Sequence, residues 1–297
     1  ECHDASGLLS RALVGELSRT VAILATDLGN PFSMTVFRGV SDFLESNRYH
    51  ALVHHVRPAN IHDPEMLSFL QTCLPSGYII LKGAEGPGGV HALEISSRGV
   101  PMVMVGGSSG IAAHAVTFDS RAAMRMAAEH VIALGHRRIG HLAGPSRSQG
   151  AKERKLGFVE GLVEHNLPVA LSSIVDAGET AAAGYAAALE TLRVQANRPT
   201  ALLCFNDMVA MGAYRAAHEL GLEIPGDLSV VGFDGLDYGA LLGPPLTTVD
   251  IQPEQLGRRA AELLARLMEG EKPAGVVTEW TQPRLLERAS VRDIRAL

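Results

Sequence analysis

Several short apolar stretches of this chain end on an acidic residue. They are VAILATD, ending at Asp27, AVTFD at Asp119, ALLCFND at Asp207, SVVGFD at Asp234 and LTTVD at Asp250. Because an isolated carboxylate is costly to bury, each acid should lie where a strand gives way to a loop or helix. Ligands of parallel α/β sheets bind beyond the carboxyl ends of the strands. We therefore expect Asp27, Asp207 and Asp234 to line a ligand cleft while partly solvated, whereas Asp119, followed by SRAAM, should cap a helix.

Two further stretches place ligand-binding side chains near the same sheet edge. In NPF, Asn30 can cap a helix that starts with Pro31, and Phe32 would offer a flat apolar wall to a sugar ring or a base. Arg154, in GAKERKLGF, belongs to the first turns of a helix that follows a strand and a Gly-Pro loop. The alternatives are that Phe32 packs into a helix interface and that Arg154 forms a surface salt bridge.

Three motifs that suggest catalysis or cofactor binding have the wrong context. GGSSG at 106–110 matches the G-x-S-x-G elbow, with Ser108 as the nucleophile, but IAAHAVTFD returns to β character too soon for the elbow's helix. GAEGPGG at 83–89 lacks the spacing of a dinucleotide site. His54 and His55 point to opposite faces of a strand, so they cannot share a metal ion. We therefore predict no catalytic residue, no cofactor and no metal, with a serine hydrolase as the less favoured alternative.

Composition excludes other classes of protein. The 297 residues are 46% hydrophobic, which suits a globular chain, and the formal charge of −6 argues against nucleic-acid binding by this chain alone. The three cysteines have no CxxC spacing, so neither a disulfide framework nor a zinc site is indicated. No apolar run approaches the ~20 residues of a membrane span, and no secretory leader opens the sequence. These features predict a cytoplasmic protein.

Short β-rich stretches alternate with amphipathic helical stretches along almost the whole chain. This pattern predicts mainly parallel sheets covered by helices on both faces. Helices are expected at 32–46, at 119–134 before Gly135, and at 206–220 before Gly221. Ten strands are many for one strongly twisted open sheet, which favours two sheets. The predicted strands are 20–26, 50–56, 77–82, 101–105, 115–118, 138–143, 172–176, 200–205, 228–233 and 246–249.

Four motifs, in order and spacing, resemble the lactose repressor family of bacterial transcription regulators over residues 10–290. They are DLGNPF, VIALGHRRIGHLAGP, FNDMVAMGAYRAAHELGLEIPGDLSVVGFDG and PPLTTVDIQPEQLGRRAAELLARLMEGE. The resemblance implies an α/β fold of two Rossmann-like subdomains with parallel sheets joined by three crossovers, the periplasmic-binding-protein-like fold of type I. It places the N-terminal subdomain at 20–118 plus 251–276 and the C-terminal subdomain at 119–250 plus 277–290, after a linker remnant at 1–19.

The function implied by this resemblance is that of a repressor's effector-binding and dimerisation core. Such a homodimer senses a small, sugar-like metabolite in the cleft between its subdomains and binds operator DNA through an N-terminal helix-turn-helix. We expect that headpiece to be absent here, because ECHDASG does not look like its end. SRALVGEL resembles the family's hinge helix, which makes Leu13 the candidate wedge in the DNA minor groove. The alternative is an exported solute-binding receptor of a transporter with the same fold.

Position by position, the resemblance implies a set of effector contacts, namely Asn30, Phe32, Arg154, Asn206 and Asp234. Arg154 would donate paired hydrogen bonds to hydroxyl or carboxylate oxygens, and Asp234 would accept from hydroxyls or an amine. Three features depart from the family's sugar binders. Gly106 and Gly107 replace an Asp-Arg pair, DAGETAAAG lacks an aromatic residue, and Ile251 replaces a polar one. These departures predict an effector with a bulkier or more apolar portion than an ordinary pyranose.

Overall fold

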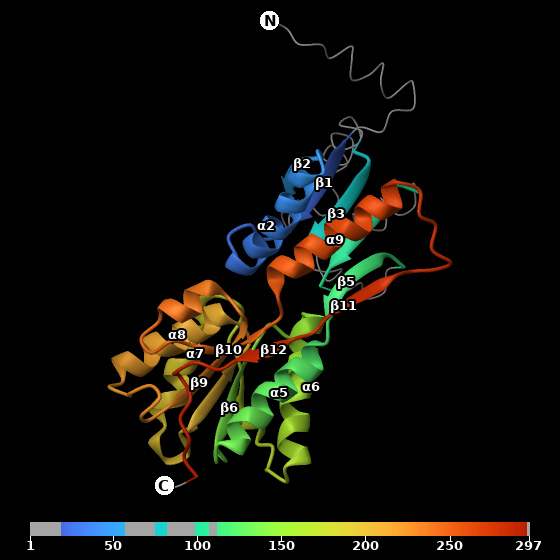
Figure 1. The fold of residues 1–297 in the computed structure, drawn as a ribbon. Helices are drawn as coiled ribbons and strands as arrows, with labels where there is room; N and C mark the ends of the chain where they lie inside the picture. Colours follow the sequence, from blue (N-terminus) through green and yellow to red (C-terminus); the bar gives the residue numbers. More distant parts are fainter. Residues whose placement is uncertain (1–18, 57–74, 82–98, 107–111, 296–297) are drawn as a thin grey trace, which may run out of the picture. The chain divides into compact units, whose positions relative to one another are not determined.

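A computed structural model describes residues 19–56, 75–81, 99–106 and 112–295 (Figure 1). Leu13, Gly107, Ser108 and the GAEGPGG segment lie outside these described residues. Within the described part, no helix combines the length and the apolar character needed to cross a bilayer. The chain divides into two compact units. Unit 1 holds the described residues up to Thr117 and Pro253–Thr281, and unit 2 holds the described residues of Phe118–Gln252 and from Gln282 onward.

Unit 1 is built on a six-stranded sheet with the strand order β11-β5-β4-β3-β1-β2. Its strands are β1 (Thr20–Ala25), β2 (His50–His55), β3 (Gly77–Leu81), β4 (Met102–Val105), β5 (His114–Phe118) and β11 (Thr278–Thr281). Strand β1 pairs in parallel with both β2 and β3. The interior strands are buried almost throughout, as expected for continuous apolar sequences covered on both faces.

Helices α2 (Pro31–Ser46) and α9 (Pro253–Met268) pack against each other in unit 1. Two glycines allow the backbones to approach closely. A Cβ on Gly39 would collide with the carbonyl oxygen of Glu254, and a Cβ on Gly257 would collide with that of Val36. The helix pair therefore depends on the absence of side chains at these two positions.

Unit 2 repeats the plan with the strand order β12-β10-β9-β8-β6-β7. Its strands are β6 (Ile139–Ala143), β7 (Ile174–Asp176), β8 (Ala201–Cys204), β9 (Ser229–Asp234), β10 (Thr247–Asp250) and β12 (Arg284–Leu286). All described pairs are parallel except β10 with β12.

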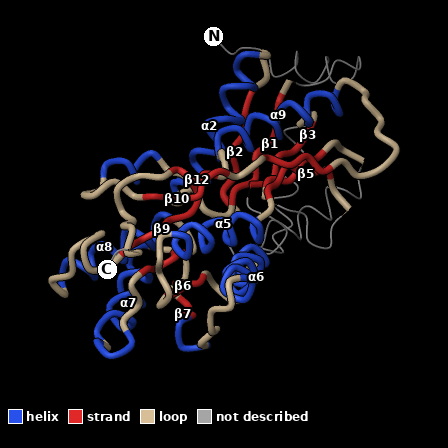
Figure 2. The backbone as a smooth tube through the Cα atoms, turned by 60° about the horizontal axis from the view of Figure 1, so that its bottom comes forward, coloured by secondary structure: helices blue, strands red, loops and turns tan. Residues whose placement is uncertain are grey.

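Two helix pairs cover opposite faces of the unit 2 sheet (Figures 1 and 2). One pair is α5 (Ser120–Ala133) with α6 (Gln149–Glu164), and the other is α7 (Ala181–Arg193) with α8 (Asp207–Glu219). On β6, Leu142 joins the apolar cluster of α7 and α8, whereas its neighbour His141 stacks on Phe158 of α6. Successive strand residues point to opposite faces, so each face has its own helix pair.

The predicted strands are all present, with ends that differ by at most two residues. Asp119 accepts a hydrogen bond from the backbone N–H of Ala122 at 2.8 Å, which confirms the predicted cap. Gly135 and Gly221 follow their helices with φ of +94° and +67°. The sequence reading missed β11 and β12, because TEWT and RLL are too short to show an alternating pattern.

The chain passes between the two units at three points, after residues 117, 252 and 281. The last passage lies later than the changeover after residue 276 that the family resemblance implies. The reason is the unexpected strand β11, which adjoins β5 and so belongs to unit 1.

We expect Gly257→Ala to lower the free energy of unfolding by roughly 1–3 kcal/mol, because forcing a methyl group against the α2 backbone outweighs the better helix propensity of alanine. Equilibrium urea unfolding measures the change. Gly275→Ala is the matched control, since a Cβ there meets no atom within 4 Å. Equal stability of the two variants would contradict the close approach of α2 and α9.

Candidate functional site

The carboxyl end of β9 has an unusual backbone. Asp234, its last residue, has φ of +113° and is only 4% exposed, and Gly235 follows with φ of +80°. A positive φ at a non-glycine residue costs of order 1–3 kcal/mol and persists only where the surroundings hold it, often at functional sites. This strain makes the strand end a candidate site.

Arg154 lies beside this strand end, on the second turn of α6. The helix begins at Ser148, whose hydroxyl caps it by accepting from the backbone N–H of Ala151. The Arg154 side chain is buried, with the residue 8% exposed, and its Nη1 is 3.9 Å from Oδ1 of Asp234. The alternative of a surface salt bridge is therefore wrong for Arg154.

Two aromatic rings hold the guanidinium of Arg154. Its central carbon lies 3.7 Å from the ring centroid of Phe233 and 4.5 Å from that of Phe205. Nη1 also donates a hydrogen bond to the carbonyl oxygen of Phe205 at 2.5 Å. Burial lowers the pKa of Arg154 to about 10, while the charges of Asp234 and Asp207 oppose that change. The guanidinium therefore stays charged at neutral pH.

One donor of the Arg154 guanidinium is unpaired within the described part of the chain. Its Nε is buried and has no hydrogen-bond partner among the described residues. A fixed guanidinium can donate parallel hydrogen bonds to two oxygens, and Asp234 beside it can accept from a hydroxyl or an amine. The cluster therefore suits a small ligand that carries polar oxygens.

Asn206 adjoins the cluster through Phe205, but its side chain already has partners. Its Oδ1 accepts from the backbone N–H of Val209 at 2.8 Å, which caps α8, and its Nδ2 donates to the carbonyl oxygen of Glu179 at 3.0 Å. Asn206 thus positions α8 and the loop before α7. Its predicted contact with an effector stays a prediction.

Asp207 differs from the partly solvated cleft acid that we expected. It is 1% exposed, accepts from the Thr248 hydroxyl at 2.6 Å and accepts from the backbone N–H of Leu236 at 2.7 Å. Burial outweighs these hydrogen bonds and raises the pKa of Asp207 to about 7. A Cβ on Gly232 would collide with this carboxylate. Asp207 therefore joins β9 and β10 from inside the sheet. The prediction of partial solvation is wrong for Asp207 and also for Asp234, which is only 4% exposed.

Asp250 also has a structural role. It accepts from the backbone N–H of Gln252 at 2.7 Å and from the guanidinium of Arg284 at 2.9 Å, which joins the ends of β10 and β12. Its partner lies 34 residues away in sequence, on a strand that we did not predict.

In unit 1 the predicted residues gather at the end of β1. Asp27 accepts from the backbone N–H of Gly29 at 3.0 Å, and Asn30 accepts from that of Phe32 at 3.0 Å. The helix begins with Pro31, which confirms the predicted cap. Phe32 is half-buried on the first turn of α2. The contacts of Asn30 and Phe32 with an effector stay predictions.

The structure thus brings Arg154, Asn206 and Asp234 together in unit 2, and Asn30 with Phe32 in unit 1. Our sequence reading missed the two rings that hold the guanidinium. A signal was present, because FND and FDG each place a phenylalanine directly before the polar end of a strand. Among the described residues, no three His, Cys, Asp or Glu side chains are grouped as a metal ion would require.

Known proteins resemble this chain over nearly its whole length. Residues 128–291 match the family described as periplasmic binding protein-like domain. The chain is 29% identical over 296 residues to the HTH-type transcriptional repressor PurR of Yersinia pestis bv. Antiqua (strain Antiqua). The match covers 99% of this chain and 86% of PurR. A regulatory protein of LacI family from Chloroflexus aggregans has a similar structure, with a TM-score of 0.82, 28% identity and coverage of 93% and 99%. A LacI family transcriptional regulator from Enterococcus faecium with bound ribose has the same fold, at 23% identity, a TM-score of 0.81 and coverage of 93% and 100%.

We expect the pKa of Asp207 to make the stability of the chain depend on pH. The folded-state pKa, about 7, lies above the ordinary value of 3.8 for an aspartate, so folding binds a proton between these values and the free energy of unfolding falls as pH rises through them. One such proton gives a slope of up to about 1.4 kcal/mol per pH unit. In Asp207→Asn this decline should be lost, as urea unfolding at pH 5, 6 and 7 measures.

The control is Asp119→Asn, which keeps a capping oxygen on an exposed helix end and should preserve the wild-type dependence. A slope that is equally steep in Asp207→Asn and in the wild type would show that another group titrates.

Proposed function

Because this chain belongs to the periplasmic-binding-protein-like family, we propose that it senses a small metabolite through the cluster around Arg154 and Asp234. Its relatives identify it as the effector-binding core of a LacI-family transcriptional regulator. The observation that carries the proposal is the buried guanidinium of Arg154 beside the carboxylate of Asp234, a residue at the end of β9 whose backbone has a positive φ. A fixed cation and a fixed acceptor in a site of low dielectric recognise oxygen-bearing ligands strongly.

The chemistry of the cluster narrows the effector. Arg154 offers donors to hydroxyl or carboxylate oxygens and Asp234 offers acceptors, whereas Phe205 and Phe233 are buried and hold the guanidinium. The bound ribose of the Enterococcus faecium regulator supports a polyhydroxylated ligand. Gly106, at the end of β4, carries no side chain that could fill space there, which supports an effector with an additional apolar part.

The other predicted contacts belong to the same proposal. Asn30 and Phe32 would contact the effector from unit 1, and Asn206 would contact it beside Arg154. Ile251 has no part in it, because it is fully buried. A two-unit sensor can adopt two arrangements, and the effector would favour the one that it binds more tightly. The shift in free energy equals the difference between its binding free energies for the two arrangements, typically ~1–3 kcal/mol.

The chain would act as a homodimer in the cytoplasm and reach operator DNA through a helix-turn-helix, with Leu13 in the hinge. The similarity over 99% of this chain to PurR, an HTH-type transcriptional repressor, supports the helix-turn-helix. The excess of acidic over basic residues supports a separate DNA-binding element, since phosphate contacts require clustered Lys and Arg. Neither the exported receptor nor the serine hydrolase is supported, because the relatives are transcriptional repressors.

We expect Arg154→Lys and Asp234→Asn to weaken effector binding about 10- to 100-fold, because hydrogen bonds to charged groups contribute roughly 1.5–3 kcal/mol each. A thermal-shift screen over pentoses, disaccharides, nucleosides and hydroxy acids identifies a binder, and calorimetry measures its affinity for each variant.

Arg121→Lys is the matched control, because Arg121 is an exposed arginine of unit 2 that pairs with Glu160. It should bind as the wild type does. Wild-type affinity in both Arg154→Lys and Asp234→Asn would refute the site.

A further inference from the structure

A hollow in unit 2 lies at the edge of the sheet opposite to Arg154 and Asp234. It has a volume of about 420 Å³. Arg138 directly precedes β6 and Thr200 directly precedes β8, so the hollow lies at the amino ends of the parallel strands. Asp234, in contrast, is the last residue of β9. The hollow is therefore separate from the cluster proposed to bind the effector.

Three arginines and one acid line this hollow, namely Arg137, Arg138, Arg292 and Asp227. Within the described residues, none of the three guanidinium groups forms an ion pair. Arg137 and Arg138 are anchored by one nitrogen each, to backbone carbonyls, which leaves their other donors available. Although the chain has more acidic than basic residues, three arginines share this hollow without an ion-pair partner in the part of the chain that the structure describes, which favours the binding of an anion.

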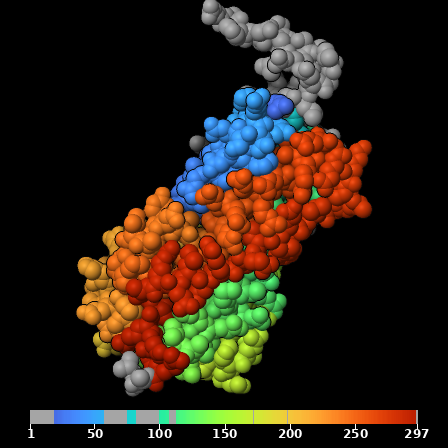
Figure 3. Space-filling view, viewed as in Figure 1, coloured from blue at the N-terminus to red at the C-terminus, as the bar shows by residue number. Residues whose placement is uncertain are grey.

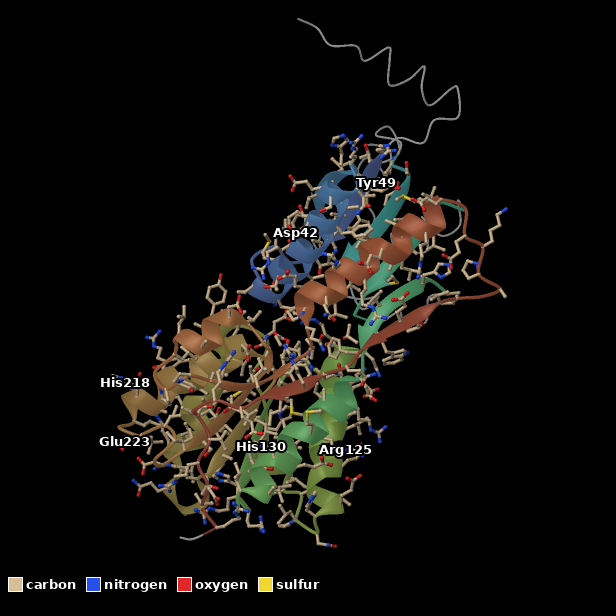
Figure 4. The ribbon with its side chains drawn as sticks, in the orientation of Figure 1. Asp42, Tyr49, Arg125, His130, His218 and Glu223 are labelled. Carbon is tan, nitrogen blue, oxygen red and sulfur yellow. The ribbon has the colours of Figure 1, made fainter. Side chains whose placement is uncertain are left out.

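The single acid of the hollow is engaged in a turn. Asp227 accepts from the backbone N–H of Glu223 at 2.9 Å, and its own N–H donates back to the carbonyl oxygen of Glu223. Glu223 is labelled in Figure 4, in the turn that follows α8. This carboxylate therefore holds the turn 223–227 and neutralises none of the three arginines by direct pairing.

His136 also lines the hollow, and its ring contacts the segment that carries Arg292. Its Nδ1 lies 2.9 Å from the Thr200 hydroxyl, and its Nε2 lies 3.1 Å from both the Ser229 hydroxyl and the carbonyl oxygen of Arg292. Burial lowers the pKa of His136, the hydrogen bond to the Arg292 carbonyl opposes this change, and the positive charges of Arg292, His130 and Arg137 add to the lowering. His136 thereby connects the start of β8, the start of β9 and the C-terminal segment beneath the hollow.

The C-terminal segment of the chain forms one wall. The backbone N–H of Ile294 donates to the carbonyl oxygen of Leu134 at 2.9 Å, and that of Arg292 donates to the Ser229 hydroxyl at 3.1 Å. Figure 3 shows this segment in dark red against the green surface of unit 2. The three arginines thus come from two distant parts of the sequence, and backbone hydrogen bonds hold these two segments side by side.

We propose that this hollow binds the phosphate group of a small metabolite, with Arg137, Arg138 and Arg292 donating to its oxygens. Guanidinium groups match the geometry of phosphate oxygens, and a phosphate carries enough charge to engage three of them. The volume exceeds that of inorganic phosphate and falls in the range of small-molecule sites, which begins at about 300 Å³. Binding would join the C-terminal segment to the start of β6 through charge-assisted hydrogen bonds.

Calorimetry with ribose 5-phosphate, ribose and inorganic phosphate as separate probes tests this proposal on the whole chain. Ribose 5-phosphate should bind, more weakly as NaCl increases, and Arg138→Gln and Arg292→Gln should each reduce its affinity at least about tenfold. Binding of inorganic phosphate with the same dependence on Arg138 and Arg292 also supports the site and shows that the anion suffices.

Arg295→Gln is the matched control. Arg295 lies on the same C-terminal segment but pairs with Asp293, so this variant should retain the affinity for ribose 5-phosphate. Circular dichroism of each variant verifies folding. The proposal is overturned if ribose 5-phosphate does not bind, or if its binding survives in Arg138→Gln and Arg292→Gln. Binding that is lost in Arg154→Lys alone would assign the probe to the other cluster and also overturn it.

Discussion

The burial of one charged guanidinium is the constraint on which the polar edge of unit 2 depends. Moving a cation out of water costs several kcal/mol unless its surroundings compensate. For Arg154 the compensation comes from the Asp234 carboxylate, the Phe205 carbonyl and two phenyl faces. These groups lie at the ends of β8 and β9, while Arg154 itself belongs to α6. The charge therefore fixes three elements relative to one another, and the positive φ of Asp234 is retained within that arrangement.

The acids that end successive strands share a sequence pattern but not a physical role. Asp119 caps a helix, Asp207 is sealed inside the sheet edge, and Asp250 pairs with an arginine of a neighbouring strand. Asp234 differs because it lies 3.9 Å from a buried arginine whose Nε has no hydrogen-bond partner among the described residues. A ligand-binding role is therefore best supported for Asp234, while the other three acids build the scaffold.

The two edges of the unit 2 sheet suit different ligands. At the carboxyl edge, one arginine is buried between two aromatic rings and lies beside an acid, which favours a ligand with hydroxyl groups. At the amino edge, three exposed arginines surround a hollow whose single acid is engaged in a turn, which favours a phosphate. The sheet between them is packed on both faces, so a ligand at either edge acts on the same rigid body.

The sequence by itself determined the strand and helix pattern, the caps at Asn30 and Asp119, and the polar residues at the strand ends. Periodicity and capping depend on residues a few positions apart, so a linear reading can recognise them. Only the tertiary structure decided which acid is buried and which arginine is held between rings. Arg154 meets the Phe205 carbonyl across 51 residues of sequence, and Asp250 meets Arg284 across 34. The edge strands β11 and β12 and the hollow beside Arg292 likewise depend on such distant pairings, since desolvation and ion pairing are set by neighbours in space and not by neighbours along the chain.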